Sequence, residues 1–380
     1  MVLLGLVSLL TDTSSEMIMP LLPVFVTGVL GGGALAIGWI EGLADATASI
    51  LKLVSGRLAD RMGRYRPLII GGYGLSSVVR PLVAAAGATW HVVAVRVGDR
   101  VGKGFRTSPR DALIAASVKA SERGAAFGLH RAMDHIGAVL GPAIAALLIS
   151  FESIDLRTLF WLAAIPGALA MVVLIGGVRD RSATTVAPVA PSDEPEPSGD
   201  GGLTRVLIPI SLFTLGNASD VFLLVKAGEA RAPLVTLPLL WMGLHVVKAA
   251  VSVPGGRLAD RWGYRPVIVL GWAIYAAVYV GLGFANDPVV VAVLFIVYGT
   301  YHGLTEGPER ALVANVASQS GRGLAFGWYH ASVGVMSLVA SVGFGAIWSY
   351  WSSRAAFLSG AAVALAASLL LLAVGRRGRV

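Results

Sequence analysis

Ionisable residues stand inside stretches that are otherwise apolar, and they are the residues of this chain that could do chemistry. Asp12 and Glu16 are four residues apart in the first such stretch, and Glu41 and Asp45 are four apart in the second. Residues at this spacing share one face of a helix. A helix rises about 1.5 Å per residue, so counting from the ends of each stretch places these acids at or near its middle. Ionisable groups at that depth in a membrane are costly and are functional candidates by default.

Two carboxylates close together in a site of low dielectric constant do not both ionise easily, so one of them can take up a proton near neutral pH. Such a group is what proton coupling requires. The predicted proton-coupling residues are Asp12, Glu16, Glu41, Asp45 and Asp134. The alternative is that basic neighbours, namely Lys52, Arg100 or Arg131, neutralise these acids permanently.

Basic residues and histidines at a similar depth are predicted to line a substrate cavity. They are Arg100, Lys103, Arg131, His245, His302 and His330. Three histidines near one depth leave a proton relay or a metal contact open as alternatives. The chain has no cysteine and no HExxH motif, so no metal site is predicted.

The elements that position these residues are predicted to be transmembrane helices. Of the 380 residues, 56% are hydrophobic and only 14% are charged, whereas soluble domains carry roughly 25% charged residues. Apolar windows of about 20 residues, the length that spans a bilayer, predict an all-α membrane protein with two sets of six helices. These lie near 2–30, 34–56, 67–87, 90–109, 122–148, 157–178, 203–225, 233–256, 266–286, 289–313, 322–348 and 354–374.

The distribution of Arg and Lys predicts the topology, because short cytoplasmic loops concentrate positive charge. One set of loops is rich in these residues and the other is nearly empty, so both termini are expected in the cytoplasm. The same placement accounts for the net charge of +8 without nucleic-acid binding. A segment rich in Pro, Ser, Gly and acids predicts a flexible linker over 179–205, between an N-terminal bundle at 1–178 and a C-terminal bundle at 206–380.

Internal repeats support this division into halves. GRLADRMGRYRP, which begins at Gly56, recurs as GRLADRWGYRP from Gly256. GFRTSPRDALIA from Gly104 recurs as GLTEGPERALVA from Gly303. Matched blocks in the same order indicate a duplicated architecture.

The repeated GRLADR loop resembles the loop between helices 2 and 3 of the major facilitator superfamily. This resemblance covers the whole chain and implies twelve helices, two six-helix bundles and alternating access about a central cavity. Arg100 and Gly104 resemble part of the family's helix 4 motif, although Arg106 stands where a second Gly is usual.

A segment of the fifth helix, GAVLGP, resembles the family motif that is associated with antiporters. Its matching residues are Gly137, Gly141 and Pro142, while Ala145 and Ala146 replace the motif's terminal glycines. The counterpart in the second half, from Ser332, lacks Gly-Pro, so this helix is specialised.

The repeated loops and the end of the fourth helix in each half are predicted to act as a conformational latch or gate. In each GRLADR loop the glycine is expected to let two helices approach closely, while the charged residues pair with acids or helix ends. The gate residues are Gly56, Asp60, Arg61, Arg64, Arg110, Asp111, Gly256, Asp260, Arg261, Glu309 and Arg310.

The leading hypothesis is a proton-driven secondary transporter that exports small organic molecules and sits as a multi-pass monomer in the inner (cytoplasmic) membrane. No enzymatic activity or cofactor is expected, and ATP coupling is disfavoured by the absence of a GxxxxGK[ST] loop. One alternative is an uptake symporter for an anionic solute such as an organic acid or a metal–chelator complex. Another is a membrane sensor or lipid-handling protein, which would not need so many charges at mid-depth.

Overall fold

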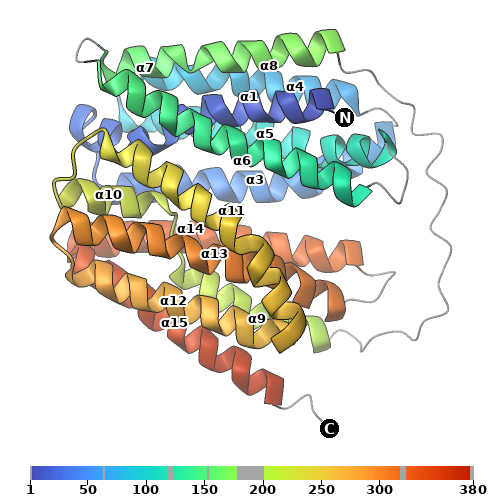
Figure 1. Ribbon diagram of the computed structural model, residues 1–380, viewed down its shortest axis with the longest axis vertical. Helices are drawn as coiled ribbons and strands as arrows, with labels where there is room; N and C mark the ends of the chain where they lie inside the picture. Colours follow the sequence, from blue (N-terminus) through green and yellow to red (C-terminus); the bar gives the residue numbers. More distant parts are fainter. Residues whose placement is uncertain are drawn as a thin grey trace. The chain divides into compact units, whose positions relative to one another are not determined.

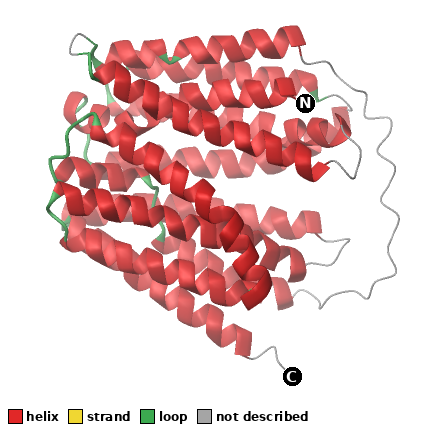
Figure 2. Ribbon diagram, viewed as in Figure 1, coloured by secondary structure: helices red, strands yellow, loops and turns green. Residues whose placement is uncertain are grey.

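The computed structural model describes residues 2–62, 65–117, 123–151, 154–177, 201–316 and 322–376. Throughout these ranges the regular secondary structure is helical, as Figure 2 shows. The helices are α1 (Val2–Ile18), η1 (Met19–Leu21), α2 (Leu22–Val24), η2 (Phe25–Val29), α3 (Ala34–Met62), α4 (Arg66–Val79), η3 (Arg80–Ala85), α5 (Thr89–Ser117), α6 (Arg123–Ile149), α7 (Leu156–Leu162), α8 (Ala164–Gly177), α9 (Gly201–Gly216), α10 (Val221–Glu229), α11 (Thr236–Trp262), α12 (Tyr264–Phe284), α13 (Pro288–Val316), α14 (Arg322–Tyr350) and α15 (Ser353–Arg376).

Eleven helical stretches among the described residues are long and apolar enough to cross a bilayer. The 29-residue helix α5 is also long enough, but it carries a series of charged residues between Arg96 and Asp111. Together they make the twelve helices that the apolar windows predict, so the expectation of an all-α, twelve-helix membrane protein is confirmed.

Of the expected helices, those near 67–87 and 157–178 divide into α4 and η3 and into α7 and α8, and two more are interrupted in ways that bear on the site. The first contains Pro20 and Pro23, which lack a backbone N–H, and the regular α-helix ends at Ile18 before a short 3₁₀ turn. The stretch expected at 203–225 divides into α9 and α10, with non-helical backbone at 217–219 and Asp220 just before α10. The break between α9 and α10 matters because Asp220, which lies in it, contacts side chains of other helices.

The described helices fall into two compact units. Unit 1 comprises Met1–Gly31, Leu43–Ser192 and Leu234–Met242, and within it α1 packs against α6 and α8 while α4 packs against α5 (Figure 1). Its buried core includes Val7, Ile69, Tyr73, Ile114 and Leu174. Large apolar side chains from four helices therefore hold this unit together.

Unit 2 comprises Gly32–Gly42, Asp193–Pro233 and Gly243–Val380. Here α12 packs against α13 and α15, and α9 packs against α14 and α15 (Figure 1). Its core is aromatic: the Phe213 and Trp272 rings stack with centroids 4.5 Å apart, and the Tyr275 and Tyr279 rings stack at 4.0 Å. Such pairs add to the stabilisation that comes from burial alone.

The unit boundaries differ in two places from a division of the chain into halves. The start of α3 packs within unit 2, where a Cβ on Gly42 would lie 2.9 Å from a Leu338 methyl carbon of α14. The start of α11, by contrast, belongs to unit 1. Of the expected linker, residues 179–200 lie outside the described residues, and its last five, from Gly201, already belong to α9.

Candidate functional site

The seam between α1 and α6 in unit 1 brings the antiporter-like glycines against the first pair of predicted acids. A Cβ on Gly137 would lie 2.5 Å from the carbonyl oxygen of Leu9 and 3.1 Å from the Cβ of Asp12. A Cβ on Gly141 would lie 2.8 Å from the Cβ of Glu16. The absence of side chains at the two glycines therefore allows α6 to approach α1 closely beside both acids.

Polar contacts show how the acids at this seam are held. The indole Nε1 of Trp241 donates a 2.7 Å hydrogen bond to Oε2 of Glu16, within unit 1. Nδ1 of His130 lies 3.3 Å from Oδ2 of Asp134, one turn along α6. Sequence reasoning missed both Trp241 and His130, although His130 is an ionisable residue four positions before a predicted acid.

Asp12 lies close enough to other ionisable groups of this seam to interact with them electrostatically. Its principal charged neighbours are Asp134 of α6 and Lys103 of α5. The structure therefore brings together three predicted proton-coupling residues, Asp12, Glu16 and Asp134, with one predicted cavity residue, Lys103. This group of four residues is called the seam cluster below.

The second predicted pair of acids lies one turn apart on α3, and the two side chains differ in exposure. Glu41 is only 2% exposed and belongs to unit 2, whereas Asp45 belongs to unit 1 and its side chain is 44% exposed. Oδ1 of Asp45 lies 3.9 Å from Nε of Arg100. Asp45 and Arg100 thus form a long, partly exposed ion pair, which is weaker than a buried one.

A buried ion pair behind the seam joins α5 to η3. Nη2 of Arg80 lies 2.8 Å from Oδ1 of Asp99, and Nη1 of Arg80 donates a 2.9 Å hydrogen bond to the carbonyl oxygen of Thr11. Arg96 approaches the other oxygen of Asp99 at 3.9 Å. The side chains of Arg80 and Asp99 are only 6% and 3% exposed, so each compensates a charge that would be costly alone. Sequence reasoning did not select Arg80 or Asp99, although each is a charged residue within an apolar stretch.

Arg106, the departure from the family's helix 4 motif, has a buried structural position. Its Nη1 donates a 2.7 Å hydrogen bond to Oγ of Ser76, and its guanidinium lies 4.4 Å from the centroid of the Tyr73 ring. A Cβ on Gly102 would lie 2.5 Å from the carbonyl oxygen of Gly72, so here a glycine does allow α4 and α5 to touch. The close approach is made by Gly102, one turn before Arg106.

Unit 2 contains a second ionisable cluster, and only two of its residues were singled out from the sequence. Oδ2 of Asp220 lies 2.8 Å from Nζ of Lys248 and 3.2 Å from Nε2 of His302. The Tyr298 hydroxyl donates a 2.7 Å hydrogen bond to Oδ1 of Asp220, and Nδ1 of His302 lies 3.3 Å from Oε1 of Glu306. These five residues are called the Asp220 cluster below. Of them, His302 was predicted as a cavity residue and Glu306 was not assigned a role.

The other two predicted histidines have different surroundings. The His330 ring lies 5.2 Å from the Tyr329 ring on α14, and His245 is partly buried on α11. Among the described residues, no group of three or more His, Cys, Asp or Glu side chains is arranged to hold a metal ion.

The predicted gate residues that can be described lie in contrasting environments. Arg110 is 8% exposed, and its Nη2 lies 2.9 Å from Oδ1 of Asp111. Glu309 is also buried, but it accepts hydrogen bonds from Nε1 of Trp272 at 3.2 Å and from the Tyr329 hydroxyl at 3.4 Å. Glu309 is therefore held by neutral donors of its own bundle. Exposed gate residues are Asp260, Arg261 and Arg310.

The expectation that the GRLADR glycine brings two helices together is wrong for Gly256, because a Cβ there would meet no atom within 4 Å. The preceding residue, Gly255, makes that approach instead, against the backbone of Gly303. A helix turns about 100° per residue, so adjacent glycines face different neighbours. The remaining predicted gate and cavity residues lie outside the described part of the structure, namely Arg64 and the side chains at Gly56, Asp60, Arg61 and Arg131.

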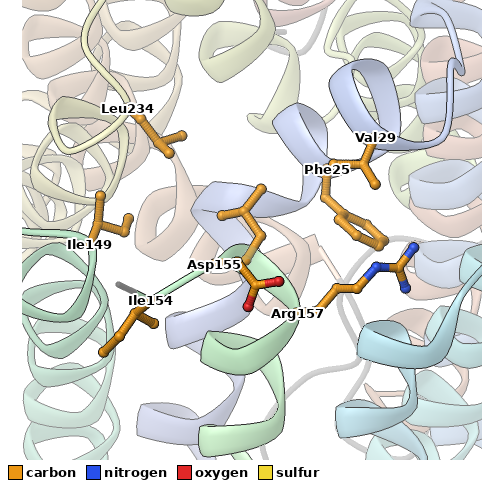
Figure 3. Close-up of a pocket in the computed structure, with 8 residues that line it drawn as sticks. Phe25, Val29, Ile149, Ile154, Asp155, Arg157 and Leu234 are labelled. Atoms are coloured by element: carbon orange, nitrogen blue, oxygen red, sulfur yellow. The ribbon is translucent and has the colours of Figure 1, made fainter. Parts of the chain in front are cut away.

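A cavity of about 350 Å³ at one end of unit 1 contains none of the predicted site residues. Figure 3 shows its mainly apolar lining and the Arg157 guanidinium beside the Phe25 ring, at 5.1 Å from the ring centroid. Asp155 at the cavity edge accepts a 2.9 Å hydrogen bond from the backbone N–H of Thr158, which lowers the pKa of this exposed carboxyl. Arg157 also donates to the carbonyl oxygen of Ala84. Both charged residues thus have local structural roles.

The described part of the chain thus contains twelve helical stretches long enough to cross a membrane, with ionisable clusters buried among them, as in a multi-pass membrane protein. The family model described as Major Facilitator Superfamily matches residues 4–246 and 234–379. The chain belongs to this superfamily, and it is a transporter rather than an enzyme.

Individual relatives agree with this assignment. The chain is 31% identical to an uncharacterised MFS-type transporter, MJ1317, of Methanocaldococcus jannaschii, over 97% of this chain and 93% of the relative. It is also 31% identical to the multidrug resistance protein MdtH of Cronobacter sakazakii, but over only 42% of this chain and 38% of that protein. A crystal structure of the nucleoside transporter NupG has a TM-score of 0.79 at 12% identity, covering 99% of this chain and 98% of that one. At that identity the likeness concerns the fold alone.

Proposed function

We propose that this transporter exports small organic molecules in exchange for protons, and that the seam cluster carries the coupling proton. The observation that carries the proposal is the placement of Gly137 and Gly141 directly against Asp12 and Glu16. Movement of α6 along α1 would alter the surroundings of both acids, because no side chain at either glycine separates the helices. A conformational change and a change in protonation would then be linked.

The composition of the seam cluster supports proton exchange. Asp12 and Asp134 are two carboxylates in mutual electrostatic contact, with Lys103 as a nearby cation. Two carboxylates close together in a buried site do not both ionise easily, so the pair can hold a proton. The partial likeness to MdtH, a protein named for multidrug resistance, supports export as the direction.

The proposal includes an orientation and a location. The transporter sits as a monomer in the cytoplasmic membrane with both termini in the cytoplasm, as the distribution of Arg and Lys favours. Protons that enter the cell would drive the solute outward. The GRLADR loops then lie on the cytoplasmic side, where their charged residues serve as the latch between states.

A second candidate function, uptake of an anionic solute with protons, is favoured by the positive charge of α5. Arg100 and Lys103 stand one turn apart on this helix, and each acts electrostatically on the other. A carboxylate or sulfonate group of a substrate would be attracted to this pair.

Transport into proteoliposomes with an imposed pH gradient distinguishes the two functions. An acidic lumen drives accumulation by an antiporter in either orientation, whereas an acidic exterior drives accumulation by a symporter. Ethidium and an organic sulfonate are suitable probes because both keep their charge at all relevant pH values and do not accumulate passively as weak acids or bases. We expect ethidium to accumulate when the lumen is acidic.

The Asp12→Asn variant tests whether the seam cluster carries the proton. We expect at least a tenfold loss of gradient-driven accumulation, with ethidium binding retained. The matched control is Asp287→Asn, because Asp287 accepts hydrogen bonds from the N–H groups of Val289 and Val290 in an exposed turn and the amide oxygen can replace it. Accumulation that responds to neither gradient in the wild-type protein would refute proton coupling, and full activity in Asp12→Asn would remove Asp12 from it.

A further inference from the structure

We propose that the Asp220 cluster is a second proton-binding site, in which the His302 ring holds a proton between the carboxylates of Asp220 and Glu306. The role of this proton in coupling rests on the proposed function, but its presence does not. The site lies wholly in unit 2, and its residues come from α11, α13 and the position just before α10.

The two nitrogens of the His302 ring face one carboxylate each. Nδ1 lies 3.3 Å from Oε1 of Glu306, and Nε2 lies 3.2 Å from Oδ2 of Asp220, although the second contact lacks the alignment of a full hydrogen bond. A neutral imidazole carries one N–H and one lone pair. With both carboxylates ionised, a neutral ring would therefore direct a lone pair towards a negative oxygen. One additional proton, on the ring or on a carboxylate, removes this repulsion.

A proton on the cluster also improves its charge balance. Nζ of Lys248 lies 2.8 Å from Oδ2 of Asp220 and also acts electrostatically on Glu306, but one lysine cannot balance both carboxylates. Arg310 of α13 acts electrostatically on Glu306, but its side chain is exposed, so the surrounding water screens it. A protonated His302 would supply the missing positive charge at 3.3 Å.

One further carboxylate, Glu309 of α13, acts electrostatically on Glu306, and the other described neighbours of the cluster are neutral hydroxyls and an amide. The Tyr298 hydroxyl donates to Asp220 and lies 3.3 Å from the Tyr301 hydroxyl, which in turn lies 3.2 Å from the Asn217 amide nitrogen. From α12, the Tyr275 ring packs against Tyr298 and Tyr301. These groups can orient Asp220 through hydrogen bonds without adding a charge.

Asp220 takes part in this cluster instead of capping helix α10. An Asp that immediately precedes a helix usually accepts a hydrogen bond from the first turn. Asp220 precedes the nine-residue helix α10, yet its side chain makes no capping hydrogen bond. Its carboxylate instead contacts three other side chains, from α11 and α13.

The exposure of the side chains indicates a route for the proton. The Glu306 side chain is 57% exposed, whereas those of His302 and Asp220 are 13% and 19% exposed. Glu306 is the most accessible member of the cluster, so we infer that it receives the proton first and passes it to Nδ1 of His302. Transfer leaves Glu306 ionised and the ring positively charged, with Nε2 facing Asp220.

Nitrogen NMR of ¹⁵N-histidine-labelled full-length protein in nanodiscs tests the site on the wild-type chain. The chain has six histidines, and the His302→Gln variant identifies the signals of His302. We expect both ring nitrogens of His302 to give the imidazolium signature at pH 7, and to change to a neutral tautomer in Glu306→Gln. The control is Glu229→Gln, which removes a carboxylate that pairs with Lys226 elsewhere in unit 2. A neutral ring in the wild-type protein, or a ring that Glu306→Gln leaves unchanged, would overturn the proposal.

Ethidium accumulation in proteoliposomes then tests what the proton does. We expect His302→Gln to lower accumulation driven by an acidic lumen at least tenfold, while fluorescence titration shows ethidium binding within twofold of wild type. Undiminished gradient-driven accumulation in His302→Gln would overturn the coupling role. If the wild-type protein responds to no gradient, the proposed function fails, whereas the NMR measurement still decides whether the site holds a proton.

Discussion

The two units place buried charge in different ways, although the chain repeats the same motifs in both. In unit 1, the ion pair of Arg80 and Asp99 is buried behind the α1–α6 seam, at which α6 presents glycines to the acids of α1. In unit 2, Asp220 is embedded among tyrosines that also pack on one another. Unit 1 thus depends on compensated charge and close backbone contact. Unit 2 depends more on aromatic packing, and the Asp220 cluster is one of several places where it buries charge.

The largest effect that distinguishes the units should come from removal of a buried carboxylate. Asp99→Ala leaves the guanidinium of Arg80 without its ionic partner in a buried site, so we expect a loss of about 3–5 kcal/mol of stability. In unit 2, Glu309→Gln leaves no charge unpaired because Trp272 and Tyr329 are neutral donors, and about 1 kcal/mol is expected. Thermal unfolding of both variants in the same detergent measures the difference, and equal losses would contradict the comparison.

A smaller effect is expected from filling the glycine seam. In Gly141→Ala the new methyl group would lie 2.6 Å from the carbonyl oxygen of Thr13, so α6 must shift, at a cost of about 1–3 kcal/mol. The same change at Gly256 meets no atom within 4 Å and should stabilise the helix by about 0.5–1 kcal/mol. Denaturation midpoints of the two variants should therefore move in opposite directions, and a shift in the same direction would argue against a tight seam.

The smallest effect should come from the exposed cap of α7, which serves as a reference outside both clusters. The hydrogen bond from Thr158 lowers the pKa of Asp155, so this carboxylate contributes stability above the ordinary pKa of an Asp, about 4. That contribution is lost as the pH falls through the lowered pKa of the folded protein. Asp155→Ala should lower the melting temperature slightly at pH 7 and by less at pH 3. A difference between the variant and the wild type that grows towards low pH would contradict this assignment.

Sequence reasoning located the acids of the seam cluster but not their partners. Asp12, Glu16 and Asp134 stand out because each is a charge inside an apolar stretch, and local spacing is enough to find such residues. Trp241 is one of nine tryptophans, and its sequence context does not indicate that its indole reaches Glu16, 225 residues away. A contact over that separation depends on how helices pack, which periodicity does not encode.

The Asp220 cluster was missed for a related reason. Asp220 lies inside the apolar stretch at 203–225, which was interpreted as a single helix, and the break before α10 was not predicted. Its sequence context, GNASD, contains turn-forming residues that could have revealed the break. The partners Lys248 and Tyr298 come from two other helices, so only their packing shows the group.

Apolar length and repeated motifs are local properties of the chain, so they were enough to predict the twelve helices, the duplicated architecture and the family. Which charged residues meet depends on the tertiary structure. It places Glu41 and Asp45 in different units, and it shows that Gly255, rather than Gly256, makes the close helix approach. It also joined His302 to two carboxylates. A buried charge needs a partner within a few ångströms, and in a helical membrane protein that partner commonly lies on another helix.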